Sequence, residues 1–259
     1  MGKIILICLV ITSLGLAGCD QTAGTGGTES IKSTGRTNDI AQTNLNLGIA
    51  YLKRGEYEKS LTKLQKAQTA DPDYPPIYNT LGVLYQQLGD KVTAEKYFRK
   101  ALSLNSSDAS TLNNYGQFLC KEARYDEAEE NFLKAAQNPL YATPEIALSN
   151  AGTCAMIQSR PDTAETHFRN ALEINPRVAV ALIQMSQISY ETANYLSARA
   201  YLQRYLEIGS HTAKSLWLGI RIERELGDKN TLSSYILLLK NKFPDSKQAT
   251  MLRDSLANK

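Results

Sequence analysis

The sequence predicts an all-α fold in which about six helical hairpins stack into a right-handed solenoid. Two observations support this fold class. Glycines recur at nearly constant spacing, because Gly48, Gly82, Gly116 and Gly152 are separated by 34, 34 and 36 residues. Other small and large apolar residues recur in phase with these glycines along most of the chain. A fixed period of this length indicates one supersecondary unit that is repeated and stacked.

The recurring residues explain how such units pack. In the second half of the units a small residue recurs, at Ser60, Ala94, Ala128, Ala164 and Ala198. Four residues later a large apolar residue follows, at Leu64, Phe98, Phe132, Phe168 and Leu202. Three residues further a second small residue follows, at Ala67, Ala101, Ala135 and Ala171. The small residues let helix backbones approach closely, and the large residue fills the space between them.

This pattern resembles the tetratricopeptide (TPR) repeat, which has a 34-residue period and Leu-Gly in its first helix. The resemblance implies six units, at residues 41–74, 75–108, 109–142, 145–178, 179–212 and 213–246. The fifth unit has Ser186 in place of the glycine, and in the sixth unit Gly219 stands one place early. Gly227 and Pro244 nevertheless keep the sixth unit in phase. One hairpin cannot bury its apolar face alone, so stability comes from stacking.

The ends of the repeat array have their own patterns. After Pro244, the apolar residues Ala249, Leu252 and Leu256 follow at helical spacing. Residues 247–259 are therefore expected to form a helix that caps the last unit. Before the first unit, residues 19–40 are rich in Gly, Ser and Thr, and we interpret them as a flexible linker.

The first residues have the pattern of a secretion signal. Lys3 is followed by an apolar run of about 13 residues, which is short for a membrane span and typical of a signal peptide. The run ends in Leu16-Ala17-Gly18-Cys19, which resembles the lipobox of bacterial lipoproteins. This resemblance implies that residues 1–18 are removed and that Cys19 carries the lipid anchor. An uncleaved N-terminal anchor is the alternative interpretation.

Composition argues against nucleic-acid binding and catalysis. The formal net charge is +3, and removal of Lys3 with the signal leaves +2, without runs of like charge. The two histidines, His167 and His211, have no His or Cys at the spacing of metal ligands. Sequence motifs of hydrolases, zinc proteases and nucleotide-binding loops are absent. We therefore predict a protein that is not an enzyme, with no metal, no cofactor and no small-molecule substrate.

Two cysteines remain in the repeats. Cys120 and Cys154 occupy similar places in the first helices of the third and fourth units, which should lie side by side. Neighbouring helices can bring Cα atoms within the range of about 4.4–6.8 Å that a disulfide requires. An exported protein meets an oxidising compartment, so we favour a disulfide. The alternative is two buried thiols that pack as small apolar residues.

The first helices of the units should line the inner face of the solenoid. Beyond the first unit, the positions expected to point inward include Asn79, Val83, Gln86, Asn113, Gln117, Ser149, Thr153, Met156, Ile183, Gln187, Tyr190, Trp217, Arg221 and Arg224. In the first unit this face is apolar over three turns, and such a patch is typical of a partner site. We assign partner binding to Leu45, Ile49, Leu52, Asn79 and Val83. The alternative is that the linker or a neighbouring helix covers this patch.

Two segments suggest a family. They are Asn113-Asn114-Tyr115-Gly116-Gln117-Phe118-Leu119, followed by Tyr125-Asp126-Glu127-Ala128 and the insertion at Pro139-Leu140-Tyr141, and Ser215-Leu216-Trp217-Leu218-Gly219-Ile220-Arg221. Both resemble the PilF/PilW family of type IV pilus pilotins. The resemblance implies a lipoprotein on the periplasmic face of the outer membrane. It also implies a partner, the subunits of the pilus secretin, whose localisation and multimerisation the protein would promote.

Three alternatives stay open at this point. Asp20 directly follows the anchor and resembles an inner-membrane retention signal. The first alternative function is that of another TPR lipoprotein, an adaptor in outer-membrane protein or cell-wall assembly. A thiol-redox enzyme is a more distant alternative, because a Cys-x-x-Cys pair is missing.

Overall fold

The computed structural model describes residues 30–257, and that part of the chain consists of helices without strands. The helices are α1 (Ser30–Lys53), α2 (Tyr57–Ala70), α3 (Pro75–Leu88), α4 (Lys91–Leu104), α5 (Ala109–Lys121), α6 (Tyr125–Gln137), α7 (Pro144–Ile157), α8 (Pro161–Ile174), α9 (Ala179–Glu191), α10 (Tyr195–Leu206), α11 (Ala213–Leu226), α12 (Lys229–Lys242) and α13 (Lys247–Ala257). Consecutive helices pair into six hairpins, and α13 packs on α11 and α12. The all-α solenoid predicted from the sequence is confirmed.

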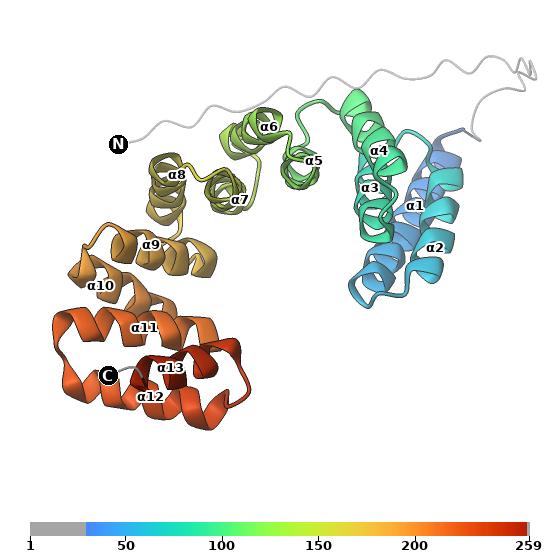
Figure 1. Ribbon diagram of the computed structural model, residues 1–259. Helices are drawn as coiled ribbons and strands as arrows, with labels where there is room; N and C mark the ends of the chain where they lie inside the picture. Colours follow the sequence, from blue (N-terminus) through green and yellow to red (C-terminus); the bar gives the residue numbers. More distant parts are fainter. Residues whose placement is uncertain (1–29, 258–259) are drawn as a thin grey trace, which may run out of the picture.

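The hairpins follow one another along an arc. Odd-numbered helices such as α5 and α7 lie on its inner side, and α6 and α8 lie on its outer side (Figure 1). Each odd-numbered helix contacts its own hairpin partner and the odd-numbered helix of the next unit. The inner face of the solenoid is therefore a row of first helices, and their side chains decide what it can bind.

The repeated glycines lie where the two helices of a hairpin cross. A Cβ atom added to Gly82 would lie 2.7 Å from the ring of Phe98, which is closer than any side chain permits. The sixth unit has the same crossing, because a Cβ on Gly219 would lie 2.8 Å from the ring of Tyr235. Gly219 is therefore the crossing residue of the sixth unit, although it stands one place early in the sequence.

Serine replaces a small residue at two crossings, and each hydroxyl has a hydrogen bond. In the first hairpin the Ser60 hydroxyl donates to the carbonyl of Gly48 at 2.8 Å. In the fifth hairpin the Ser186 hydroxyl donates to the carbonyl of Ala198, also at 2.8 Å. Both serines are fully buried, so an unpaired hydroxyl there would be destabilising. Ser60 lies in the second helix of its hairpin and Ser186 in the first helix of its own, so a serine is accommodated on either side of the crossing.

The turn inside each hairpin contains a left-handed residue. Glycine supplies it in the first, second and sixth units, where Gly55, Gly89 and Gly227 have φ of 74°, 80° and 73°. The third, fourth and fifth units adopt the same conformation without glycine, at Ala123, Ser159 and Ala193, with φ of 58–59°. A side chain is strained in this conformation. The turn geometry therefore follows from the stacking of the units and not from local preference alone.

Polar clusters join consecutive units away from the core. Glu95 of α4 accepts hydrogen bonds from Arg124 at 2.6 Å, from the Tyr115 hydroxyl at 2.9 Å and from Arg99 at 3.0 Å. Partial burial acts to raise the pKa of Glu95, but the hydrogen bonds from Arg124, Arg99 and Tyr115 outweigh it and lower the pKa to about 2. The buried carboxylate of Glu223 is paired with Arg199 in a similar joint between α10 and α11.

Both ends of the repeat array differ in detail from the expected boundaries. Helix α1 begins at Ser30, so the linker expected over residues 19–40 is helical in its second half. This segment has one glycine, Gly35, and no proline, and extending an existing helix is far easier than starting one. At the other end Ala249 and Leu252 of α13 are buried, whereas Leu256 is 44% exposed. The signal segment and Cys19 lie outside the described residues.

Candidate partner-binding face

A pocket of about 600 Å³ opens on the inner face of the first two units. It is lined by Ile49, Leu52 and Lys53 of α1, Gly55 and Tyr57 at the following turn, Asn79, Thr80, Val83 and Gln87 of α3, and Asn114 of α5. The C-terminal halves of α1 and α3 therefore supply an apolar wall, through Ile49, Leu52 and Val83. The side-chain amides of Asn79 and Asn114 lie at the edge of the pocket toward α5. Such a combination is typical of a binding site, because apolar contacts give affinity and a few polar groups give orientation.

Four of the five residues assigned to partner binding from the sequence line this pocket together. They are Ile49, Leu52, Asn79 and Val83. Ile49 and Leu52 are half-buried and pack at the margin of the core between the first two units. The sequence pattern missed Tyr57 and Asn114, which come from the neighbouring turn and from the third unit. Asn114 directly follows the predicted inward residue Asn113, so the missed signal was the rotational phase of that helix.

The assignment of Leu45 to this surface is wrong. Leu45 is 2% exposed and belongs to the core cluster that includes Leu64, Ile77 and Leu81. One turn further along α1, Ile49 reaches the pocket, but the turn that holds Leu45 is covered by α3. The apolar stripe of the first helix therefore serves two purposes: its middle part seals the joint between units, and only its end faces the pocket.

Asparagine pairs connect the inner helices of consecutive units. The side-chain amide of Asn114 donates to the side-chain carbonyl of Asn79 at 3.0 Å, and Asn150 donates in the same way to Asn113 at 2.9 Å. Asn79 and Asn113 are nearly buried, whereas Asn114 and Asn150 are half-buried. These pairs fix the orientation of the amides at the edge of the pocket, which leaves a defined polar edge beside an apolar wall.

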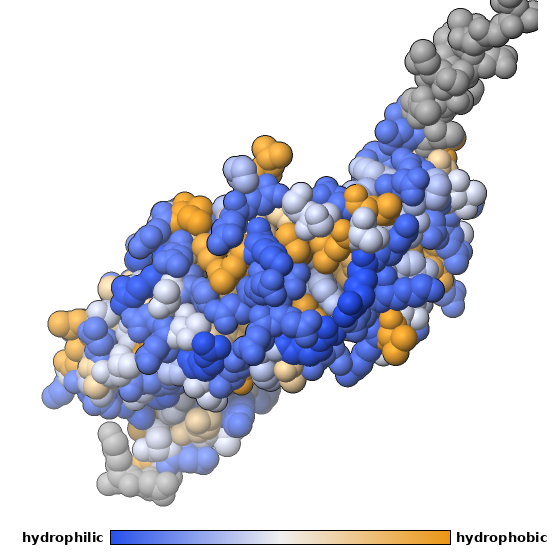
Figure 2. All heavy atoms as spheres, turned by 90° about the horizontal axis from the view of Figure 1, so that it is seen from above, coloured by the Kyte–Doolittle hydropathy of each residue, from blue (hydrophilic) through white to orange (hydrophobic). Residues whose placement is uncertain are grey.

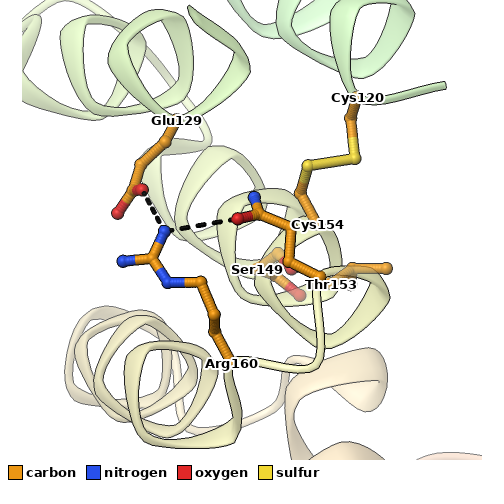
Figure 3. The surroundings of a disulfide bond; sticks show 7 residues. Cys120, Glu129, Ser149, Thr153, Cys154 and Arg160 are labelled. Carbon is orange, nitrogen blue, oxygen red and sulfur yellow. Dashed lines mark hydrogen bonds and ion pairs between the residues drawn. A yellow bond between two sulfur atoms is a disulfide. The ribbon is translucent and has the colours of Figure 1, made fainter. Parts of the chain in front are cut away.

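The inner helices of the third and fourth units are joined covalently in the structure. Cys120 of α5 and Cys154 of α7 form a disulfide with a Cα–Cα distance of 5.9 Å (Figure 3). On the outer side of the same joint, Glu129 of α6 lies 2.8 Å from His167 Nε2 and 3.6 Å from Arg160. Figure 3 shows Arg160 reaching toward Glu129 from the start of α8. These units are thus joined on both sides, beside the two-residue insertion in the loop between them.

The face seen in Figure 2 is mainly hydrophilic, with apolar side chains in scattered patches. Within residues 30–257, no group of three His, Cys, Asp or Glu side chains is placed to hold a metal ion. In the same part of the chain, no helix combines the length and the apolarity that crossing a membrane would need.

Comparison with known proteins gives consistent matches. The profile of the TPR repeat matches residues 41–89, and that of the tetratricopeptide repeat matches residues 75–108. The chain is 31% identical over 236 residues to the type IV pilus assembly protein PilF of Pseudomonas aeruginosa, covering 91% of this chain and 92% of PilF.

Two solved structures extend this similarity to the fold. The structure of Pseudomonas aeruginosa PilF matches with a TM-score of 0.78 at 31% identity, over 85% of this chain and 99% of that one. The structure of PilW, described as a widely conserved type IV pilus biogenesis factor, matches with a TM-score of 0.73 at 27% identity, over 83% of this chain and 99% of that one.

Proposed function

This chain belongs to the PilF/PilW family of type IV pilus TPR proteins, and from that premise we propose that it acts as a pilotin. In this role it binds subunits of the pilus secretin, brings them to the outer membrane and promotes their assembly into a ring. The lipid anchor gives the location, and the inner face of the repeats holds the secretin. No reaction is required of the protein, only retention of a partner.

The observation that carries this proposal is the pocket at the first two units. Ile49, Leu52 and Val83 present apolar surface next to the amides of Asn79 and Asn114. An apolar peptide segment of the secretin would bury side chains against this wall and align its backbone with the amide groups. Buried apolar area is the main source of affinity in such contacts, and the oriented polar groups set the register.

Anchoring is proposed to depend on Cys19. Acylation there would hold the protein on the periplasmic face of the outer membrane, because about two acyl chains are enough for stable attachment. Asp20 is the feature of the sequence that favours the inner membrane instead. Separation of inner and outer membranes on a density gradient, with immunodetection of this protein, distinguishes the two locations. A Cys19→Ala variant should lose membrane attachment in the same experiment.

The proposal can be tested by secretin capture. Val83→Asp places a charge in the pocket, and we expect capture of the secretin to fall by about tenfold or more, as at other binding hot spots. Val92→Asp is a matched control, because Val92 of α4 lies outside the pocket and is 83% exposed. Undiminished capture by the Val83→Asp variant would show that the secretin binds elsewhere.

A deletion strain tests the role in the cell. If the protein is a pilotin, secretin rings should be lost from the outer membrane while outer-membrane proteins in general are retained. Expression of the wild-type chain should restore the rings, and expression of the Val83→Asp variant should not. Intact rings together with a general envelope defect would contradict the pilotin role and would indicate a broader adaptor.

A further inference from the structure

We propose that the inner face at the last unit is a second binding surface, which takes an acidic segment of a protein partner. Four residues of α11, Lys214, Trp217, Arg221 and Arg224, follow one another at intervals of three, four and three residues. Residues at this spacing share one face of a helix. Lys214 is exposed and the other three are half-buried, so this face carries cations and an aromatic ring toward the solvent.

The two arginines are held in place by neutral partners. The guanidinium of Arg221 lies 4.4 Å from the ring centroid of Tyr190, and it donates a hydrogen bond to the Gln187 side-chain carbonyl at 3.0 Å. The Arg221 Nε atom is buried and has no hydrogen-bond partner among the described residues. The guanidinium of Arg224 lies 5.8 Å from the ring centroid of Trp217 and donates a hydrogen bond to the Ser255 hydroxyl of α13 at 3.0 Å. These contacts orient both guanidinium groups without neutralising their charge.

Neither arginine has an ion-pair partner in the part of the chain that the structure describes. Two other half-buried arginines of the chain do have such partners. The side chains of Arg124 and Arg199 are 30% and 28% exposed, and each forms an ion pair with a glutamate. Arg221 is linked to a carboxylate indirectly, through Gln187, whose side-chain amide donates a hydrogen bond to Glu191 at 2.5 Å. A half-buried guanidinium without a carboxylate retains a strong preference for an anion from outside.

Part of this arrangement has a structural role. Tyr190 and Arg221 stand at the same offsets from the helix-crossing residues of their units as Cys120 and Cys154 do in theirs. The contact of Arg221 with Tyr190 therefore takes the place that the disulfide occupies between the third and fourth units. This role accounts for the position of Arg221. It accounts neither for the charge of Arg224 nor for the exposed Lys214 on the same face.

The chemistry of the surface defines its partner. Planar guanidinium groups bind carboxylates through paired hydrogen bonds, and the half-buried Trp217 ring offers apolar contact beside them. A polypeptide with acidic residues interleaved with apolar ones satisfies both features, and the row of first helices admits an extended or helical peptide. This surface lies at the opposite end of the repeat array from the pocket, so its occupant is independent of the segment bound there.

Trp217 provides a direct probe, because it is the only tryptophan of the chain. A short peptide of alternating Glu and Leu, added to the purified mature protein, should change the emission of Trp217. A matched peptide of alternating Gln and Leu should leave it unchanged. Arg224→Gln should weaken binding of the acidic peptide by about tenfold, the effect of losing one charge-assisted hydrogen bond. Arg177→Gln is the control, because Arg177 is exposed and lies outside this surface.

Several outcomes would overturn the proposal. These are the absence of any effect of the acidic peptide, equal binding of the Gln peptide, and equal weakening by Arg177→Gln. An emission change with phosphatidylglycerol vesicles, but not with phosphatidylcholine vesicles or with the acidic peptide, would assign the surface to acidic lipid instead. Arg221→Lys separates binding from folding, since it keeps the charge. Retained binding by this variant supports the electrostatic assignment, whatever its thermal stability.

Discussion

The first and last units present opposite chemistry on the inner face although they share one hairpin design. Relative to the helix-crossing glycine, Leu45 and Ile49 of α1 correspond to Leu216 and Ile220 of α11. In the last unit both are fully buried, because α13 packs over them. In the first unit only the earlier residue is covered, by α3, and Ile49 faces the pocket. Helix α13 thus covers the apolar side chains of α11, whereas Arg221 and Arg224 of the same helix stay partly exposed.

The difference teaches that the repeat pattern constrains the crossings between helices and leaves the inner face free to vary. A small residue meets a large side chain at the crossings of both ends, at Gly48 with Leu64 and at Gly219 with the ring of Tyr235. Between these fixed points, the first unit presents aliphatic side chains and the last unit presents guanidinium groups. This freedom is what allows the two proposed binding surfaces, one at each end of the array, to differ in chemistry.

The largest expected effect is the loss of stability when a core residue of the first unit, Leu45, is replaced. Leu45→Asp buries a charge without a partner, and we expect the free energy of unfolding to fall by roughly 3–5 kcal/mol. Leu47→Asp makes the same change at an exposed position of α1 and should stay within about 0.5 kcal/mol. Urea unfolding followed by circular dichroism measures both. Equal destabilisation by the two variants would contradict the burial of Leu45.

The next effect concerns the joints between units. Replacement of Cys120 and Cys154 together by serine should lower the free energy of unfolding by about 2–4 kcal/mol, because the disulfide closes a loop of 34 residues. Arg221→Gln removes the cation–π contact with Tyr190 and the hydrogen bond to Gln187 at the equivalent joint, and it should cost less, about 1–2 kcal/mol. Thermal unfolding without reductant gives the comparison. If the serine variant unfolds at the wild-type temperature, the disulfide does not stabilise its joint.

Acid should weaken the joint between the second and third units, because it protonates Glu95. The folded-state pKa of Glu95 is lowered from its ordinary value of 4.5 to about 2, so its ionised form stabilises the fold above about pH 4.5. This contribution is lost as the pH falls from about 4.5 to 2. Because the side chain is partly exposed, we expect a loss of about 1–2 kcal/mol. Unfolding measured across this range should depend less on pH in Glu95→Gln, and an unchanged profile would contradict the assignment.

The smallest expected effect on the free energy of unfolding comes from the turns, where the middle units have Ala or Ser in the left-handed conformation and the other units have Gly. Ala123→Gly relieves the left-handed strain of the third turn, and the greater flexibility of unfolded glycine offsets part of the gain. We expect stabilisation of about 0.5 kcal/mol. Gly89→Ala makes the reverse change in the second turn and should destabilise by a similar amount or more. Chemical unfolding of the two variants checks that the signs are opposite.

Much of the candidate site could be predicted from the sequence, and the two errors of that prediction have different causes. The inward positions were counted in steps along each helix, which identified Ile49, Leu52, Asn79 and Val83 as neighbours. Adjacent residues on a helix point about 100° apart, so a small error in rotation exchanges one neighbour for the next. For this reason the sequence identifies Asn113 and not Asn114. Leu45 lies on the same stripe of α1 as Ile49, and the sequence does not show that α3 covers its turn. The pairing of charges, as in Glu95 with Arg124, could not be derived from spacing.

By itself, the sequence determined the repeat: the period, the crossings of small residues with large apolar ones, and the number of hairpins. These features are local, because each unit must bury the same face against its neighbour. Only the tertiary structure decided which part of the first helix is covered, where α13 closes the array and which arginines keep an unpaired charge. Those properties depend on side chains from three or four helices at once, and their relative positions are set by how the units stack.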